Sequence, residues 1–68
     1  MKIPANSFNE EQLKEIKKAG INIDFQKDYS ADEILILEDK FENLVMDNQF
    51  NKVSFYENLL DTFQDATK

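Results

Sequence analysis

Residues 29–47 read YSADEILILEDKFENLVMD, and this stretch decides the fold. Ser30 and Glu33 have the spacing of a capping box, and Tyr29 with Ile34 has the spacing of the hydrophobic staple that accompanies one. At about 100° per residue, five apolar side chains fall on one broad helical face. They are Ile34, Leu37, Phe41, Leu44 and Val45. We therefore expect a long central helix over residues 31–48, with the rest of the chain folded around it.

Two further helices are predicted from the flanking segments. Asn9 with Gln12 predicts a capped helix over residues 9–19, which Gly20 ends. Residues 52–65 show the cleanest amphipathic pattern in the chain and predict a third helix. Residues 21–25 alternate apolar and polar side chains, which is the period of an extended segment and indicates a connector between the first two helices. With 68 residues, one Gly and one Pro, the chain is predicted to be a single all-α domain over 1–68, a small three-helix fold.

Composition excludes several classes of function. The chain has no Cys and no His, which removes disulfides, thiolate chemistry and the usual zinc sites, so we expect no cofactor. The net charge is -6 and the eight basic residues are all lysine, so we expect neither nucleic acid nor an anionic membrane as a partner. No apolar run has the length of a secretory signal or a membrane span. We expect a cytoplasmic protein and, because the sequence begins with Met, a complete gene product.

The connector contains a possible calcium-binding loop. Oxygen-bearing side chains recur there at the positions of an EF-hand: Asn22, Asp24, Gln26, Asp28, Ser30 and Glu33. The loop departs from that pattern because its first ligand is Asn and because Lys27 stands where the sharp turn requires Gly. The capping box also accounts for Ser30 and Glu33 by itself. A metal-responsive module that binds Ca²⁺ through residues 22–33 is therefore one alternative function.

Catalysis is not predicted. Neighbouring carboxylates such as Glu38 and Asp39 point in different directions on a helix. No His, Cys or Arg is present to orient a substrate, so a solvated helix face explains these acids better than an active site. We expect a protein that is not an enzyme.

Three apolar residues of the 31–48 helix lie off its core face. They are Leu35, Ile36 and Met46. The structural interpretation, which we favour, is that the helices on either side cover this helix almost all round. The functional interpretation is that these residues and Phe50 form a patch rimmed by acids, as in a protein-binding surface or a homodimer. The predicted interaction surface consists of Leu35, Ile36, Met46 and Phe50 with Asp32, Asp39 and Glu42.

The leading functional hypothesis is a non-enzymatic protein–protein interaction module, with another protein or a second copy of the chain as its partner. The acids of residues 30–50 also permit a minor version of this hypothesis, in which the protein mimics nucleic acid and occupies a basic groove of another protein. Residues 20–35, GINIDFQKDYSADEIL, resemble segments of small bacterial proteins, and this resemblance implies no activity.

Overall fold

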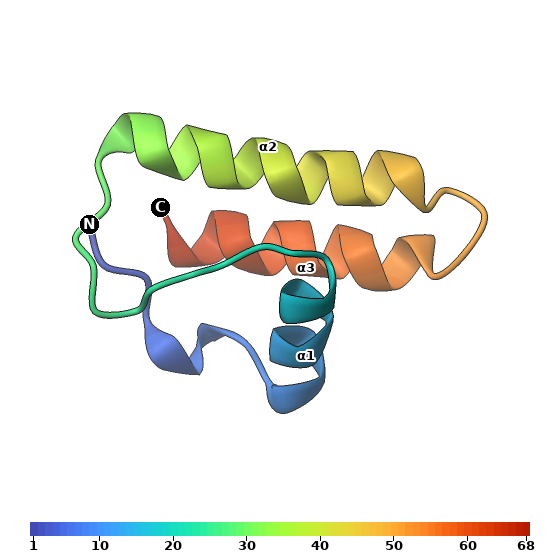
Figure 1. Cartoon of the computed structure of the whole chain (residues 1–68), viewed down its shortest axis with the longest axis horizontal. Coiled ribbons are helices and arrows are strands. Elements are labelled where there is room, and N and C mark those ends of the chain that lie inside the picture. Colours follow the sequence, from blue (N-terminus) through green and yellow to red (C-terminus); the bar gives the residue numbers. More distant parts are fainter.

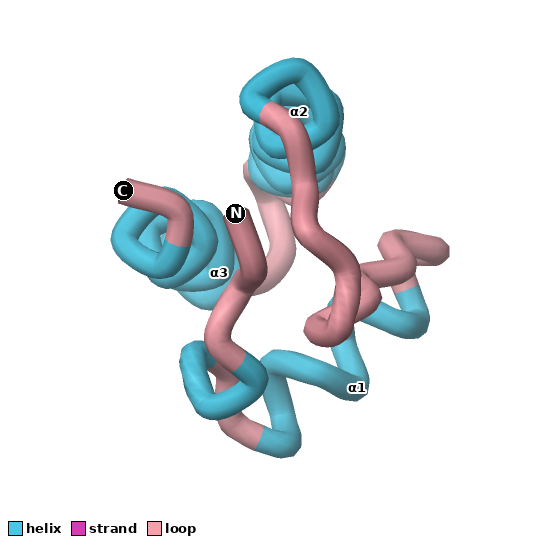
Figure 2. Tube along the Cα trace, turned by 90° about the vertical axis from the view of Figure 1, so that its left-hand side faces the viewer, coloured by secondary structure: helices cyan, strands magenta, loops and turns pink.

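Four helical segments make up the computed structural model, which describes the whole chain from Met1 to Lys68. They are a short 3-10 helix η1 (Ala5–Ser7) and the helices α1 (Glu10–Lys18), α2 (Ala31–Asp47) and α3 (Val53–Ala66). Helices α2 and α3 lie side by side and antiparallel along the longest axis (Figure 1). Helix α1 runs across this pair, as the two perpendicular views show (Figures 1 and 2). The all-α prediction is confirmed, and each predicted helix end lies within one residue of its observed position.

Both predicted capping boxes are present. At α1, the Asn9 side chain accepts the Gln12 N–H at 2.8 Å, and the Gln12 side chain accepts the Asn9 N–H at 2.9 Å. At α2, Ser30 Oγ accepts the Glu33 N–H at 3.2 Å, and Glu33 Oε1 accepts the Ser30 N–H at 3.1 Å. Each box satisfies two backbone donors that a helix start otherwise leaves unpaired, so both starts are determined locally.

Helix α1 ends in a Schellman motif at Gly20. Gly20 has φ +80°, a left-handed conformation that glycine adopts without steric cost. Its N–H donates to the Lys17 carbonyl at 3.0 Å, and the Ile21 N–H donates to the Ile16 carbonyl at 3.1 Å. Ile16 and Ile21 are both buried, so the motif also brings its two apolar residues into the core. The chain leaves this turn as the connector, which leads to the start of α2 (Figure 1).

Helix α3 begins differently, without a side-chain cap. The residue before it, Lys52, has φ 58° and ψ 28°, and it is the only non-glycine residue with a positive φ. The preceding turn starts where the Asn48 side-chain amide donates to the Leu44 carbonyl at 2.7 Å and so closes the last turn of α2. The tight reversal between α2 and α3 therefore depends on an unfavourable backbone conformation at Lys52.

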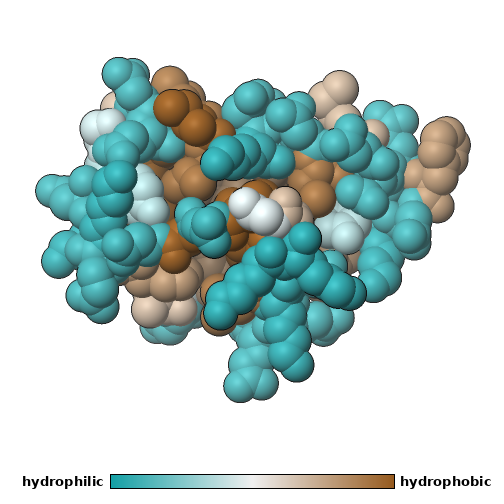
Figure 3. All heavy atoms as spheres, viewed as in Figure 1, coloured by the Kyte–Doolittle hydropathy of each residue, from teal (hydrophilic) through white to brown (hydrophobic).

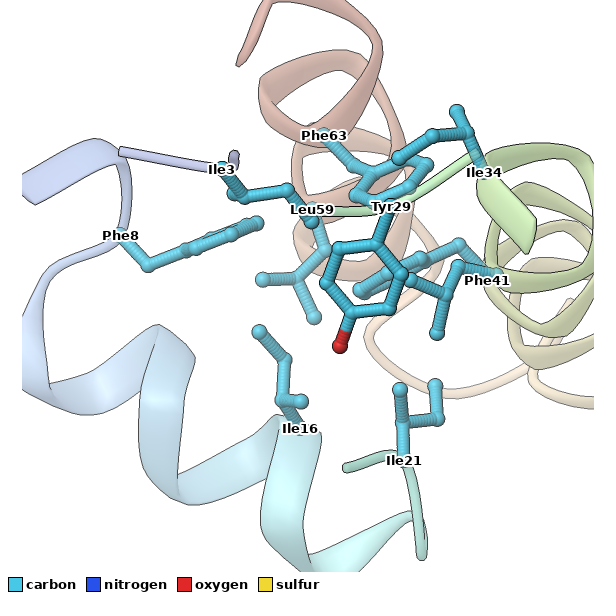
Figure 4. Packing of buried hydrophobic residues seen from close by; sticks show 10 residues of the cluster. Ile3, Phe8, Ile16, Ile21, Tyr29, Ile34, Phe41, Leu59 and Phe63 are labelled. Atoms are coloured by element: carbon cyan, nitrogen blue, oxygen red, sulfur yellow. The ribbon is translucent and has the colours of Figure 1, made fainter. Parts of the chain in front are cut away.

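One hydrophobic core joins the helices to the N-terminal segment and the connector (Figure 4). Its ten buried residues are Ile3, Phe8, Ile16, Ile21, Tyr29, Ile34, Leu37, Phe41, Leu59 and Phe63. On α2, four residues of the predicted core face are confirmed: the first three are buried, and Leu44 is half-buried and packs against them. Val45 is half-buried and does not belong to this cluster. Ile3, which no sequence pattern placed in the core, is among the most deeply buried side chains.

The N-terminal segment is held against the connector by its own backbone. The Met1 ammonium forms an ion pair with Asp28 and donates to the Tyr29 carbonyl at 2.8 Å. The Tyr29 N–H donates to the Met1 carbonyl at 2.7 Å. The Tyr29 hydroxyl accepts the Asp24 N–H at 2.9 Å, so the middle of the connector is also bonded to Tyr29. These bonds hold the first residues beside the connector and place Ile3 in the core.

Helix α2 is not covered on two sides, so the structural interpretation of its extra apolar residues is wrong. Helix α1 has only nine residues and crosses the α2–α3 pair, so it cannot run along α2 (Figures 1 and 2). Leu35 and Ile36 consequently remain 61% and 59% exposed.

None of the helices has both the length and the apolar character needed to cross a membrane.

Candidate interaction surface

The outer face of α2 presents the large apolar side chains that the sequence placed off the core. Leu35, Ile36 and Met46 are each about three-fifths exposed, and Phe50, in the turn after α2, is fully exposed. In Figure 3, hydrophobic atoms interrupt the hydrophilic surface along the α2 edge and at the end where α2 turns into α3. A single exposed apolar residue is ordinary, but four from one helix and its following turn form a candidate binding surface.

Four exposed residues form a line along α2, which we call the 35–46 stripe: Leu35, Asp39, Glu42 and Met46. Their spacings of four, three and four residues keep them within about 60° of arc at about 100° per residue. Leu35 and Met46 are three turns apart, about 16 Å at about 1.5 Å per residue. The stripe therefore has an apolar residue at each end and two carboxylates between them. Ile36 lies beside its first end, and Phe50 lies beyond its second.

The carboxylates of this face have no basic partner. Of the six acids on α2, only Glu33 forms a salt bridge, with Lys27 of the connector. Asp32, Asp39 and Glu42 are exposed and form none. Lys40, the only basic residue of α2, lies about 100° or more around the helix from Asp39. The outer face therefore carries negative charge that no side chain of the protein neutralises.

The predicted calcium ligands are not brought together. Asp24 accepts the Gln26 N–H at 2.9 Å, which is a local turn, and Asp28 pairs with the Met1 ammonium. Ser30 and Glu33 form the capping box of α2. No group of three or more acidic side chains has an arrangement that could hold a metal ion. The predicted EF-hand-like coordination sphere of Asn22, Asp24, Gln26, Asp28, Ser30 and Glu33 is therefore not formed, because the carboxylates have separate partners.

The charge pairs of this loop shift three pKa values. The hydrogen bond from the Met1 ammonium holds the pKa of Asp28 below its ordinary value. The hydrogen bond from the Lys27 ammonium, assisted by the Ser30 N–H, lowers the pKa of Glu33. The same bond to Glu33 raises the pKa of Lys27, whose ammonium also lies 5.0 Å from the centre of the Tyr29 ring. Each shift favours the charged form, so these groups stabilise the loop as ion pairs.

An open hollow lies between the end of α1 and the side of α2, with a volume of about 310 Å³. Its lining residues are Ala19, Gly20, Ile21, Lys40, Asn43, Leu44 and Asp47. The charged side chains among them are one lysine and one aspartate, and no nucleophile is paired with a base there.

Comparison of the chain with protein-family models, curated proteins and solved structures finds no match.

Proposed function

We propose that this protein is a non-enzymatic protein–protein interaction module and that the outer face of α2 is its docking surface. The observation that carries the proposal is the exposure of Leu35 and Met46 on a helix whose opposite face already packs on the core. Full burial of a large apolar side chain contributes about 1.5–3 kcal/mol, and a partner that covers this face would gain the part of it that corresponds to the exposed three-fifths of Leu35 and Met46. The fold leaves most of each of these side chains uncovered, which supports a role in binding.

Two other features support the proposal. A binding site for protein usually combines exposed apolar side chains with polar and charged ones, and the outer face of α2 carries both. Phe50, fully exposed at the tip of the α2–α3 turn, is an aromatic side chain of the kind that anchors interfaces. The chain has no cysteine, which suits the reducing cytoplasm, and we propose that it works there.

Site-specific photo-crosslinking in cells of the native host tests the proposal. A photoreactive residue replaces Asn43, an exposed, uncharged side chain beside the 35–46 stripe, so that no acid of the stripe is removed. The matched control is Asn58, an equally uncharged and exposed residue on α3. We expect a discrete protein adduct from position 43, none from position 58, and loss of the adduct in the double variant Leu35→Glu/Met46→Glu.

The double variant is a fair test because it should fold normally. Both side chains are mostly exposed, so each replacement is expected to change the free energy of unfolding by no more than about 0.5 kcal/mol. Equal adducts from positions 43 and 58, or an adduct at 43 that the double variant retains, would show that the outer face of α2 is not the docking surface. Absence of any adduct at 43 would also count against the proposal.

A further inference from the structure

We infer that the docking surface takes a basic helix of another protein and not a second copy of this chain. The inference rests on the proposed function and names the partner of the same surface. It follows from the order of residues in the 35–46 stripe, which is apolar, acidic, acidic, apolar. The two apolar ends offer anchoring contacts, and the two acids between them set the charge that a partner must bring.

The stripe reads the same in both directions, and this symmetry disfavours self-association. In an antiparallel pair of α2 helices that matches Leu35 with Met46 of the second copy, Asp39 faces Glu42 of that copy, twice. In a parallel pair, Asp39 faces Asp39 and Glu42 faces Glu42. Both registers that join apolar ends therefore oppose like charges at the centre, where no lysine neutralises them. The same order favours a partner with the opposite central charge.

A helix is the partner element that fits this spacing. Its own apolar residues at i and i+11 would lie about 16 Å apart on one face and meet Leu35 and Met46. Lysine or arginine at i+4 and i+7 would then lie opposite the two acids of the stripe. An extended segment normally binds by adding to the edge of a sheet, and this protein has helices and no strands. The complementary partner is thus an amphipathic helix with a basic centre.

Labelled synthetic helices and the purified full-length protein test the inference. The probe is a helical peptide of about 18 residues, or five turns, with Leu at i and i+11 and Lys at i+4 and i+7. One matched peptide carries Glu at the two central positions, and another carries Ala at the two anchors. Binding is measured by fluorescence anisotropy. We expect the Leu/Lys peptide to bind at least about tenfold more tightly than either matched peptide and to weaken with added salt.

Protein variants assign the charge effect to the stripe. Asp39→Asn/Glu42→Gln should weaken binding of the Leu/Lys peptide by about tenfold and narrow its advantage over the Glu peptide. The matched control, Glu10→Gln/Glu11→Gln, removes the same charge from exposed positions at the start of α1. It should leave the affinity within about twofold of wild type, because those acids lie on another helix.

Several results would overturn the inference. Equal binding of the Lys and Glu peptides, or no measurable binding of any peptide, would remove the basic helix as occupant. A dimer of the protein alone in sedimentation analysis, abolished by Leu35→Glu/Met46→Glu, would identify a second copy instead. In each of these cases the proposed function stands if the adduct at position 43 persists. If positions 43 and 58 instead give equal adducts, the docking surface itself is ruled out. Failure of the basic-helix inference and failure of the proposed function are therefore distinguishable.

Discussion

The rings of Phe41 on α2 and Phe63 on α3 lie with their centroids 4.8 Å apart and their planes inclined by 29°. Both side chains are fully buried. Phe8, just before α1, lies on Phe41 as well, with a centroid separation of 6.3 Å and an interplanar angle of 10°. Three aromatic rings thus join the N-terminal segment to both long helices at the centre of the core (Figure 4).

Truncation of Phe63 is expected to remove a large share of the stability of the protein. Phe63→Ala should cost about 3–5 kcal/mol, because it removes a fully buried ring and leaves a cavity beside Phe41. A chain of 68 residues has a total stability of roughly 3–10 kcal/mol at about 0.05–0.15 kcal/mol per residue. Urea unfolding followed by circular dichroism measures the loss. Phe63→Leu should cost clearly less, and equal costs for the two variants would contradict a stacked ring at this position.

Ile3 is expected to matter as much as a helical core residue. Ile3→Ala should lower the free energy of unfolding by about 2–5 kcal/mol, because the side chain is almost completely buried. Ile36→Ala is the matched control, since it makes the same truncation on the exposed face of α2 and should change stability by no more than about 0.5 kcal/mol. Similar costs for both variants in urea unfolding would show that the N-terminal segment is not docked.

Lys52→Gly is expected to stabilise the protein. Its backbone lies at φ 58°, where a residue with a Cβ atom is strained by about 1–2 kcal/mol. Glycine removes this strain but adds freedom to the unfolded chain, so we expect a net gain of about 0.5–1 kcal/mol. Lys52→Ala removes the same side chain, keeps the strain and should give no such gain. Thermal unfolding compares the three proteins, and a melting temperature of Lys52→Gly at or below that of Lys52→Ala would refute the assignment.

The Asp28 carboxylate is expected to stabilise the fold near neutral pH and to lose this effect in acid. The Met1 ammonium lowers the pKa of Asp28 in the folded state, so the carboxylate stabilises the fold above its unfolded pKa of about 3.9. This contribution disappears as the pH falls through the lower, folded pKa. Wild type should therefore be more stable than Asp28→Asn at about pH 6, and the difference should be smaller near pH 2.5.

Urea unfolding at these two pH values measures the Asp28 effect. Asp61→Asn is the control, because Asp61 is exposed on α3 and forms no salt bridge, and it should show no comparable change with pH. The experiment contradicts the ion pair if the deficit of Asp28→Asn remains the same at acid pH. The pKa of Glu33 is lowered in the same direction by Lys27, so wild type itself should lose some stability over the same interval.

Calcium is expected to have no effect on the melting temperature. The carboxylates of Asp28 and Glu33 already pair with the Met1 ammonium and Lys27, and Asp24 accepts a backbone N–H. A calcium ion would have to break these interactions before it gained enough oxygen ligands. Thermal unfolding with millimolar CaCl₂, and with matched NaCl as the ionic-strength control, tests this. A calcium-specific rise in melting temperature would restore the metal-binding alternative.

The sequence by itself determined the helices and their limits. The capping boxes that begin with Asn9 and Ser30, and the Schellman motif at Gly20, depend on residues at most five apart. The core face of α2 follows from helical periodicity alone, which also singled out Leu35, Ile36 and Met46 as residues off that face. Such features can be predicted because all the interacting groups belong to one short segment.

Only the tertiary structure decided whether those three residues are covered. That outcome depends on the direction of α1, which crosses the long pair and leaves the outer face of α2 open (Figure 2). Tertiary structure likewise decided that Asp28 meets Met1, 27 residues away, and that Ile3 enters the core. No local pattern encodes these contacts, because they form when the connector brings distant segments together and the shared burial of apolar surface selects one arrangement.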